Sequence, residues 1–226
     1  MKEKIHPALK SFIMTDAVKK WDEILKESRG VGIDAGVCFS TANTFCQILE
    51  KDLGIPCKIE PVETLIGNDK AKDLFDFYIK EGGDVEAFMT HLSDTINRKG
   101  RDNLTPDDPV ASGMGIGKEE NMFHFVMNLP KQKEVIDLTI GHYKRPQWGI
   151  DCENYWSKYD TKGYRYGHLD GEDVWNRSGC VLYTRQKDTP ARIGVDPEKY
   201  KKEVESLRKY MHDKISKRNI PVFLKR

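Results

Sequence analysis

The stretch that decides the fold is residues 36–59, GVCFSTANTFCQILEKDLGIPCKI. Its apolar side chains recur three and four residues apart, which is typical of one face of an α-helix; they are Ala42, Phe45, Cys46, Leu49 and Leu53. Gly54 and Pro56 are typical of the chain just after a helix, and alternation over residues 57–60 indicates a strand. We therefore expect a helix over residues 38–53 that leads into a strand over residues 56–62.

Hydrophobic periodicity and turn residues predict the remaining elements. We expect helices over residues 15–28 and 196–218, helical segments around residues 74–78 and 88–96, and strands over residues 122–129, 134–140 and 180–184. Thr15 is the expected cap of the first helix and Gly30 its end, whereas residues 100–117 are rich in Gly, Pro and Asp and are expected to form a loop. Helices at both ends with strands between them predict an α+β fold with an antiparallel sheet.

The composition describes one nearly neutral chain with a core. Its 226 residues carry 37 Lys plus Arg against 36 Asp plus Glu, so the formal net charge is +1. This balance argues against a nucleic-acid-binding protein, whose domain normally has a clear basic excess. Hydrophobic residues make up 38% of the chain, which is enough for one sizeable core. We therefore expect a single domain over residues 1–226.

Cysteine usage and targeting signals indicate the cellular compartment. The five cysteines are an odd number and form no C-x-x-C pair; they are Cys38, Cys46, Cys57, Cys152 and Cys180. Such usage is typical of free thiols in a reducing compartment. No segment reaches the ~18 consecutive apolar residues that cross a membrane, and the N-terminal sequence MKEKIHPALKSFIM has no secretory signal. We therefore expect a cytoplasmic protein with no membrane partner.

Cys38 differs from the other cysteines in its position. It follows the glycine-rich residues 30–36 and is expected to begin the helix over residues 38–53. A helix N-terminus offers unpaired backbone N–H groups and the positive end of the helix dipole, which favour the nucleophilic thiolate. The same N–H groups can stabilise an oxyanion. Cys38 is therefore a candidate nucleophile, and the competing interpretation is a small buried hydrophobic residue.

His124 lies within the apolar strand over residues 122–129, where an imidazole needs a partner for its ring nitrogens. If the hairpin closes symmetrically around residues 130–133, the two residue numbers of each facing pair add to 263, as for 129 and 134. Asp137 then lies on the same face as His124, on the diagonal and within side-chain reach. A carboxylate there can orient the imidazole and stabilise its charged form. The competing interpretations are a core histidine and a strand-end aspartate bound to the backbone.

Two blocks of sequence resemble transglutaminase-like proteins of the papain-like superfamily. Residues 36–59 resemble the family's nucleophile helix, including the Gly-Ile-Pro that ends it and the strand that follows. The segments HFVMNL (residues 124–129) and VIDLT (residues 135–139) are similar to the family's histidine strand and Asp-x-Thr strand. The resemblance implies a papain-like α+β core in which Cys38 is the nucleophile, His124 the base and Asp137 the orienting residue.

The chain departs from that family's pattern in three respects. Cys38 and His124 are 86 residues apart, and we assign the excess to a helical insertion over residues 67–120 that covers the site or selects the substrate. Val126 stands where the family usually has a tryptophan. No glutamine precedes Cys38, so a papain-type glutamine is absent from the oxyanion hole, and only the Cys38 backbone N–H is assigned as a donor.

These observations predict a cysteine-dependent acyl-transfer enzyme: a peptidase, amidase or deamidase that acts on a protein or peptide-like amide through a thioester. Hydrolysis is favoured over transfer to an amine, because water needs no second binding site. The alternative is a non-enzymatic binding domain on the same fold with a vestigial triad. Residues 112–119 fail the phosphate-loop pattern at two required positions, so we expect no nucleotide cofactor there but a flexible hinge.

Three other features have weaker functional interpretations. A zinc site built from Cys38, Cys46, Cys57 and His124 is disfavoured, because the cysteine spacings of 8 and 11 residues differ from the short pairs of structural zinc sites; we expect no metal and no cofactor. The basic residues of the C-terminal helix are expected to form a solvated face and not a nucleic-acid surface. The aromatic residues of the segment 143–175 line a groove or pack in the core, and His142 and His168 are expected on the surface or in loops.

Overall fold

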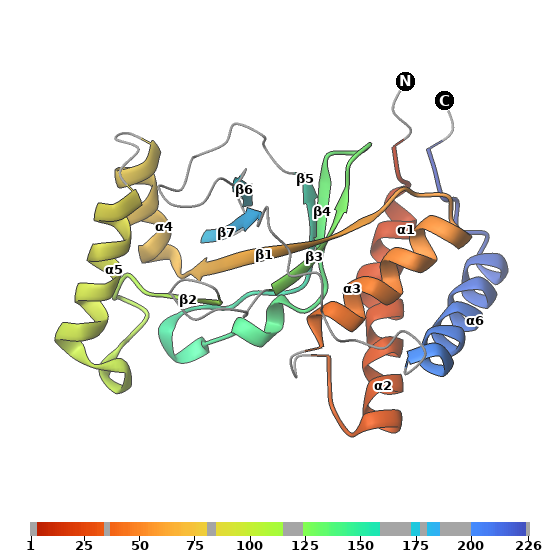
Figure 1. Cartoon of the computed structure of the whole chain (residues 1–226), viewed down its shortest axis with the longest axis horizontal. Helices are drawn as coiled ribbons and strands as arrows, with labels where there is room; N and C mark the ends of the chain where they lie inside the picture. Colours follow the sequence, from red (N-terminus) through yellow and green to blue (C-terminus); the bar gives the residue numbers. More distant parts are fainter. Residues whose placement is uncertain are drawn as a thin grey trace.

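A computed structural model shows an antiparallel sheet with groups of helices at its two ends (Figure 1). It describes residues 4–33, 37–80, 85–114, 124–158, 173–176, 180–185 and 200–224. The helices are α1 (Pro7–Phe12), α2 (Val18–Arg29), α3 (Cys38–Gln47), α4 (Asp69–Phe75), α5 (Val85–Lys99) and α6 (Lys201–Lys217). Short π or 3₁₀ segments are η1 (Ile13–Ala17), η2 (Ile48–Asp52), η3 (Asp76–Lys80), η4 (Arg101–Asn103), η5 (Ile140–Tyr143) and η6 (Pro146–Trp148). The strands are β1 (Lys58–Gly67), β2 (Ala111–Met114), β3 (His124–Leu129), β4 (Glu134–Asp137), β5 (Tyr155–Lys158), β6 (Asp173–Asn176) and β7 (Cys180–Arg185).

The N-terminal helical run, α1–η1–α2, begins eight residues earlier than predicted. His6 caps it, since its ring Nδ1 accepts a hydrogen bond from a backbone N–H of the first turn, and Pro7 occupies the first helical position. The prediction that Thr15 is the cap is wrong: its hydroxyl donates to a carbonyl four residues earlier, inside the helix. The predicted end is confirmed, because Gly30 adopts the left-handed conformation with φ +69°.

Helix α3 begins at Cys38, as predicted, and continues through η2 to Asp52. Its first turn is fixed to α2 by a buried hydrogen bond of 2.9 Å from Trp21 Nε1 to Thr41 Oγ1. The inner face of α3 packs against β3 in the main hydrophobic core, to which α1, α2 and α6 also contribute. These helices form the right-hand group in Figure 1. The α+β class predicted from the sequence is thus confirmed.

The strand order in the sheet is β5-β4-β3-β1-β7-β6, and β2 also pairs with β1. In the β3–β4 hairpin Met127 faces Ile136 and Leu129 faces Glu134, so the predicted register, with facing numbers that add to 263, is confirmed. Strand β4 ends at Asp137, three residues before the predicted end, since the chain turns into η5.

Strand β1 is longer than predicted and pairs along its whole length. Its first half pairs with β3, from Lys58 to Val62, and its second half pairs with both β7 and β2. Strand β2 corrects the prediction that residues 100–117 are all loop. Glycine is needed there for a close backbone approach, because a Cβ on Gly113 would lie 2.0 Å from the carbonyl oxygen of Thr64.

Helices α4 and α5 lie in the segment where helices were predicted, residues 67–120, and form their own small core. Its buried members come from both helices and from β1; they are Leu65, Ala71, Phe75, Phe88 and Leu92. This pair lies at the end of the sheet away from α3 (Figure 1). Whether the insertion covers the site stays a prediction, because residues 81–84 and 115–120 of it lie outside the described residues. The role of the insertion in substrate selection stays a prediction.

The C-terminal elements agree with the predicted types. Strand β7 spans residues 180–185 and α6 spans residues 201–217, while residues 196–199 and 122–123, the expected starts of α6 and β3, lie outside the described residues. No helix in the described parts of the chain is both long enough and apolar enough to cross a membrane.

Candidate active site

Cys38 and His124 are brought together by the residues that follow them. Each is the first residue of its element, α3 and β3. The rings of Phe39 and Phe125 pack edge to face, with centroids 5.0 Å apart and an interplanar angle of 79°. This contact places the start of the helix against the start of the strand. The Cys38 thiol consequently lies close enough to the His124 side chain to raise the pKa of the imidazole.

His124 and Asp137 form a buried pair across the hairpin. His124 Nε2 lies 2.7 Å from Asp137 Oδ2, and the two side chains are 2% and 0% exposed. The other carboxylate oxygen, Oδ1, accepts hydrogen bonds from Thr139, 3.0 Å from its backbone N–H and 3.3 Å from its hydroxyl. Asp137 is therefore held in place, and it orients the imidazole from the diagonal position that the hairpin register predicted.

The electrostatics of this pair favour a charged imidazole. Burial alone would lower the pKa of His124, but the negative charge of Asp137 and the hydrogen bonds with Asp137 and Cys38 raise it to about 10. The imidazole therefore holds a proton at neutral pH. Since Nε2 is engaged by Asp137, Nδ1 is the ring nitrogen left for exchange with a reacting group beside Cys38. Cys38 is half-buried, whereas His124 and Asp137 are buried.

Tyr143 is a neighbour of His124 that sequence reasoning did not single out. It is the last residue of η5, and its ring packs edge to face against the imidazole, with centroids 5.3 Å apart and an interplanar angle of 77°. The sequence offered Tyr143 only as the first of many aromatic residues in the segment 143–175. The one signal in the sequence for a contact between Tyr143 and His124 was that Tyr143 follows Asp137 by only six residues. Strand β4 ends at Asp137, and η5 then turns the chain back.

The other cysteines and histidines have different surroundings. Cys46, Cys57 and Cys152 are buried, and His142 is half-buried in η5. Within the described ranges, no group of three or more His, Cys, Asp or Glu side chains could hold a metal ion. Of the expected hinge over residues 112–119, the first three residues belong to β2. Residues 115–119 lie outside the described residues, as do His168 and the residues 34–36 before Cys38.

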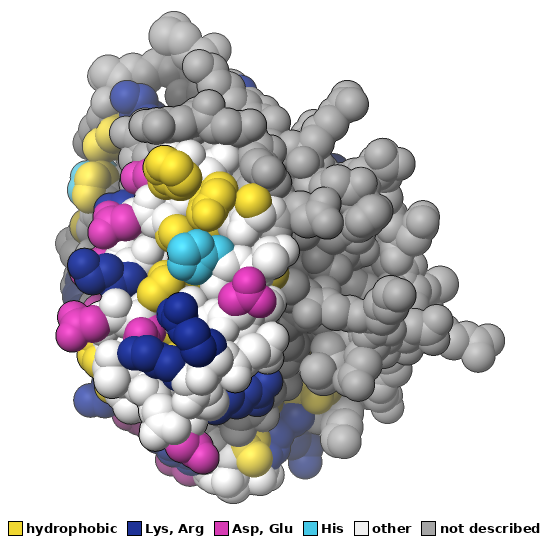
Figure 2. Space-filling view, turned by 90° about the vertical axis from the view of Figure 1, so that its left-hand side faces the viewer, with side chains coloured by type: hydrophobic (Ala, Val, Ile, Leu, Met, Phe, Trp, Pro, Cys, Tyr) yellow, Lys and Arg dark blue, Asp and Glu magenta, His cyan; other side chains and the backbone are white. Residues whose placement is uncertain are grey.

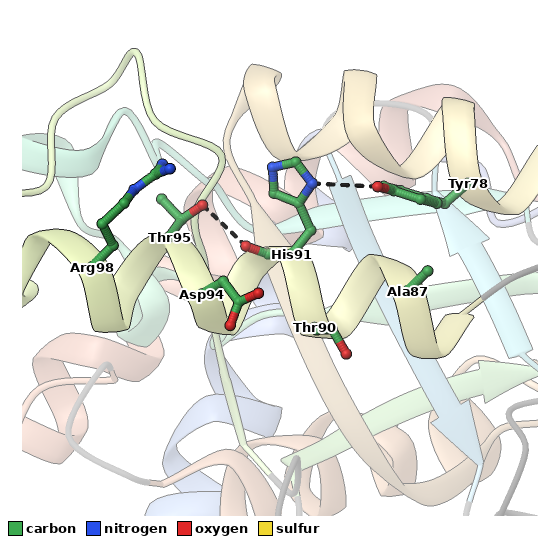
Figure 3. Close-up of a pocket in the computed structure, with 7 residues that line it drawn as sticks. All are labelled: Tyr78, Ala87, Thr90, His91, Asp94, Thr95 and Arg98. Atoms are coloured by element: carbon green, nitrogen blue, oxygen red, sulfur yellow. Dashed lines mark hydrogen bonds between the residues drawn. The ribbon is translucent and has the colours of Figure 1, made fainter.

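A hollow of about 570 Å³ lies on the helical insertion and opens on the end of the molecule away from α3 (Figures 2 and 3). It is lined by Tyr78, Ala87, Thr90, His91, Asp94, Thr95 and Arg98. The Tyr78 hydroxyl lies 3.4 Å from His91 Nδ1, as the dashed line in Figure 3 shows. Cys38, His124 and Asp137 are not among the lining residues, so this hollow is separate from the candidate active site.

Comparison with known proteins gives no family assignment: no protein-family model, curated protein or solved structure matches this chain. The papain-like core therefore stays a prediction, carried by the resemblance of residues 36–59, 124–129 and 135–139. What the geometry adds is the proximity of Cys38, His124 and Asp137, which are 86 and 13 residues apart in sequence.

Proposed function

We propose that this chain is a cysteine-dependent acyl-transfer enzyme that cleaves an amide bond of a protein or peptide-like substrate through a thioester. The observation that carries the proposal is the buried His124–Asp137 pair, 2.7 Å between Nε2 and Oδ2, beside a half-buried Cys38 at the start of α3. A nucleophile, a base and an orienting carboxylate in contact are the arrangement of nucleophilic catalysis by thiols.

The proposed reaction has two steps, and His124 carries the proton in each of them. The reaction begins with the proton already on the imidazole and the negative charge on the Cys38 sulfur, which forms a bond to the substrate carbonyl carbon. The C–N bond then breaks, and the imidazolium gives its proton to the leaving amine. In the second step the neutral imidazole takes a proton from water, and the water oxygen adds to the thioester carbonyl carbon. The C–S bond then breaks, the acid leaves, and the pair of negatively charged sulfur and protonated imidazole is restored. The raised pKa of His124, about 10, supports the role of proton carrier beside a charged sulfur.

The negative charge on the substrate oxygen also needs hydrogen-bond donors. Cys38 is the first residue of α3, so its backbone N–H is one of the first-turn groups that have no partner within the helix. We assign that N–H as one donor, and the positive end of the helix dipole adds to it. We assign no second donor to the substrate oxygen among the described residues.

The test is selective labelling of Cys38. Iodoacetamide is applied to the folded protein between pH 5 and pH 9, and the labelled peptides are identified by mass spectrometry. We expect Cys38 to react readily below pH 8 and His124→Ala to abolish that reactivity. The buried Cys46, Cys57 and Cys152 are expected to stay unlabelled in the same sample.

His91→Ala is a matched control for the histidine substitution, because His91 also contacts a tyrosine but lies in the separate hollow. It is expected to leave the labelling of Cys38 unchanged. If Cys38 is inert below pH 8, or if His124→Ala has no more effect than His91→Ala, the catalytic proposal is wrong. The remaining candidate is then a non-enzymatic binding domain with a vestigial triad.

We also infer that the chain works in the cytoplasm, or another reducing compartment. The neighbouring Cys46 thiol and burial raise the pKa of the Cys57 thiol, and both cysteines are free. In an oxidising compartment two neighbouring thiols tend to form a disulfide. Thiol titration of the protein, unfolded without reductant directly after isolation from its cell, should count five free cysteines per chain. A count of three would contradict this inference.

A further inference from the structure

The hollow on the helical insertion runs along one face of helix α5. Its lining residues on α5 recur three and four residues apart, and Tyr78 of η3 adds a wall beside them. Its volume of about 570 Å³ lies within the range of small-molecule sites in proteins, about 300–1,000 Å³. Because the lining contains none of the three residues of the proposed reaction, a role for this hollow goes beyond that reaction.

One part of the lining is a wall of two rings. Tyr78 and His91 meet edge to face, with centroids 6.1 Å apart and an interplanar angle of 65°, and the Tyr78 hydroxyl lies 3.4 Å from His91 Nδ1 (Figure 3). Thr95 is 2% exposed, and its hydroxyl donates a hydrogen bond of 3.0 Å to the His91 carbonyl within the helix. These three residues therefore offer a ligand mainly ring surface.

The other part of the lining carries two opposite charges. Asp94 and Arg98 are exposed and four residues apart on α5. Residues at that spacing are neighbours on one helix face, with about 5–6 Å between their Cβ atoms. Among the residues that the structure describes, neither side chain forms an ion pair or a hydrogen bond. The hollow therefore holds a guanidinium and a carboxylate whose hydrogen-bonding capacity is unused.

Two other helical pairs show the same order and spacing of charges in the closed form. Asp22 lies 2.6 Å from Lys26, and Asp213 lies 2.9 Å from Lys217. On α5 the two side chains are turned apart, with Arg98 on the side of the His91 ring (Figure 3). The gap between the guanidinium and the Asp94 carboxylate is therefore open to a ligand that carries both charges.

We propose that this hollow binds a free α-amino acid as its zwitterion. The ligand carboxylate accepts hydrogen bonds from the Arg98 guanidinium, whose planar fork of N–H donors matches a carboxylate. The ligand ammonium donates to the Asp94 carboxylate, and the ligand side chain lies against the rings of His91 and Tyr78. A simple anion would satisfy Arg98 but bring its charge close to Asp94, and a simple cation would do the reverse.

The rings also indicate which amino acids bind best. Aromatic side chains gain from edge-to-face or offset contacts with other rings, so we expect phenylalanine to bind more tightly than alanine. Since ion pairs between exposed groups are weak, the dissociation constant for L-phenylalanine is expected to be about 1–10 mM. Salt screens exposed charges, so the affinity is expected to fall as the salt concentration rises.

The test is a titration of the full-length, ¹⁵N-labelled protein with L-phenylalanine, followed by the amide shifts in NMR spectra. We expect saturable shifts along α5. N-acetyl-L-phenylalanine lacks the ammonium, and L-phenylalanine amide lacks the carboxylate. Each is expected to bind about fivefold or more weakly than the free amino acid. This comparison of ligands uses the unchanged protein, so it does not depend on the folding of a variant.

Substitutions test the two charges from the side of the protein. Asp94→Asn and Arg98→Gln are each expected to weaken the binding of L-phenylalanine by about fivefold or more. The melting temperature should stay unchanged, because neither residue has an ion pair to lose in the described structure. Arg101→Gln and Asp102→Asn are matched controls, since both residues are exposed and close in sequence but do not line the hollow. They should bind as the wild type does.

Three results would overturn the inference. They are the absence of saturable shifts with L-phenylalanine, equal binding of N-acetyl-L-phenylalanine, which would indicate a simple anion site, and equal losses in the control variants, which would indicate a general effect of charge. The proposed function is tested separately, because Asp94→Asn and Arg98→Gln are expected to leave the labelling of Cys38 unchanged. Either proposal can therefore fail while the other holds.

Discussion

Asp137→Asn is the substitution for which the structure predicts the largest loss at the site. The Asp137 carboxylate is fully buried, lies 2.7 Å from His124 Nε2 and accepts two hydrogen bonds from Thr139. Asparagine keeps one oxygen for Thr139 but removes the charge opposite the imidazole. Removing one partner of a buried ion pair costs about 3–5 kcal/mol. For a chain of this size each kcal/mol lowers the melting temperature by about 2–4 °C, so we expect a fall of about 6–20 °C.

The pH dependence of this loss follows from the raised pKa of His124. The folded value, about 10, lies above the ordinary value of 6.5. The stabilisation is therefore complete below pH 6.5 and is lost as the pH rises through 10, where the folded imidazole gives up its proton. The difference between wild type and Asp137→Asn should be largest at pH 6 and small at pH 10. Thermal or urea unfolding followed by circular dichroism measures it.

Asp108→Asn is a matched control for that measurement. Asp108 also accepts hydrogen bonds from the backbone N–H and the hydroxyl of a threonine, Thr105, both 3.0 Å long. Its ionic partner is Lys99, which is 40% exposed, so the pair is expected to contribute about 1 kcal/mol or less. If Asp137→Asn destabilises the protein no more than Asp108→Asn at pH 6, the argument for a charged, buried histidine pair is refuted.

Three further substitutions test contacts that hold β4, β2 and α3 in place. Glu134→Gln should lower the free energy of unfolding in urea by about 1–3 kcal/mol, because Glu134 is buried and forms an ion pair with Lys10 Nζ at 2.6 Å. Gly113→Ala should speed amide hydrogen exchange in β2, since its Cβ would lie 2.0 Å from a backbone oxygen of β1; unchanged exchange would contradict that clash. Trp21→Phe should cost about 1 kcal/mol and slow Cys38 labelling, because the 2.9 Å bond to Thr41 fixes the first turn of α3; equal labelling would show that α3 holds its position without it.

Local sequence was sufficient where short-range geometry decides the structure. The four-residue link between β3 and β4 leaves one symmetrical register, and the observed pairs have facing numbers that add to 263, as predicted. That register placed Asp137 beside His124. Helix α3 was also predictable, because its apolar stripe and Gly54 mark one face and one end.

Sequence alone was insufficient where distant segments decide the structure. Strand β2 has a loop-like composition and is a strand because β1 lies beside it. The helical start at Pro7 depends on a histidine cap, which is uncommon among capping residues. Tyr143 reaches His124 through the turn of η5, and nothing in the local pattern separates it from the aromatic residues that follow.

The pairing of β1 with β7 has a consequence for how this chain is made. Gly67 pairs with Cys180 and Val62 with Arg185, so one edge of β1 has no neighbour until ribosomes have added more than a hundred further residues. At about 5–20 residues per second this interval is on the order of 10 s. During it the second half of β1 is an open edge that can pair with another nascent chain. Yield of correctly folded protein is therefore expected to depend on synthesis rate and on chaperone supply.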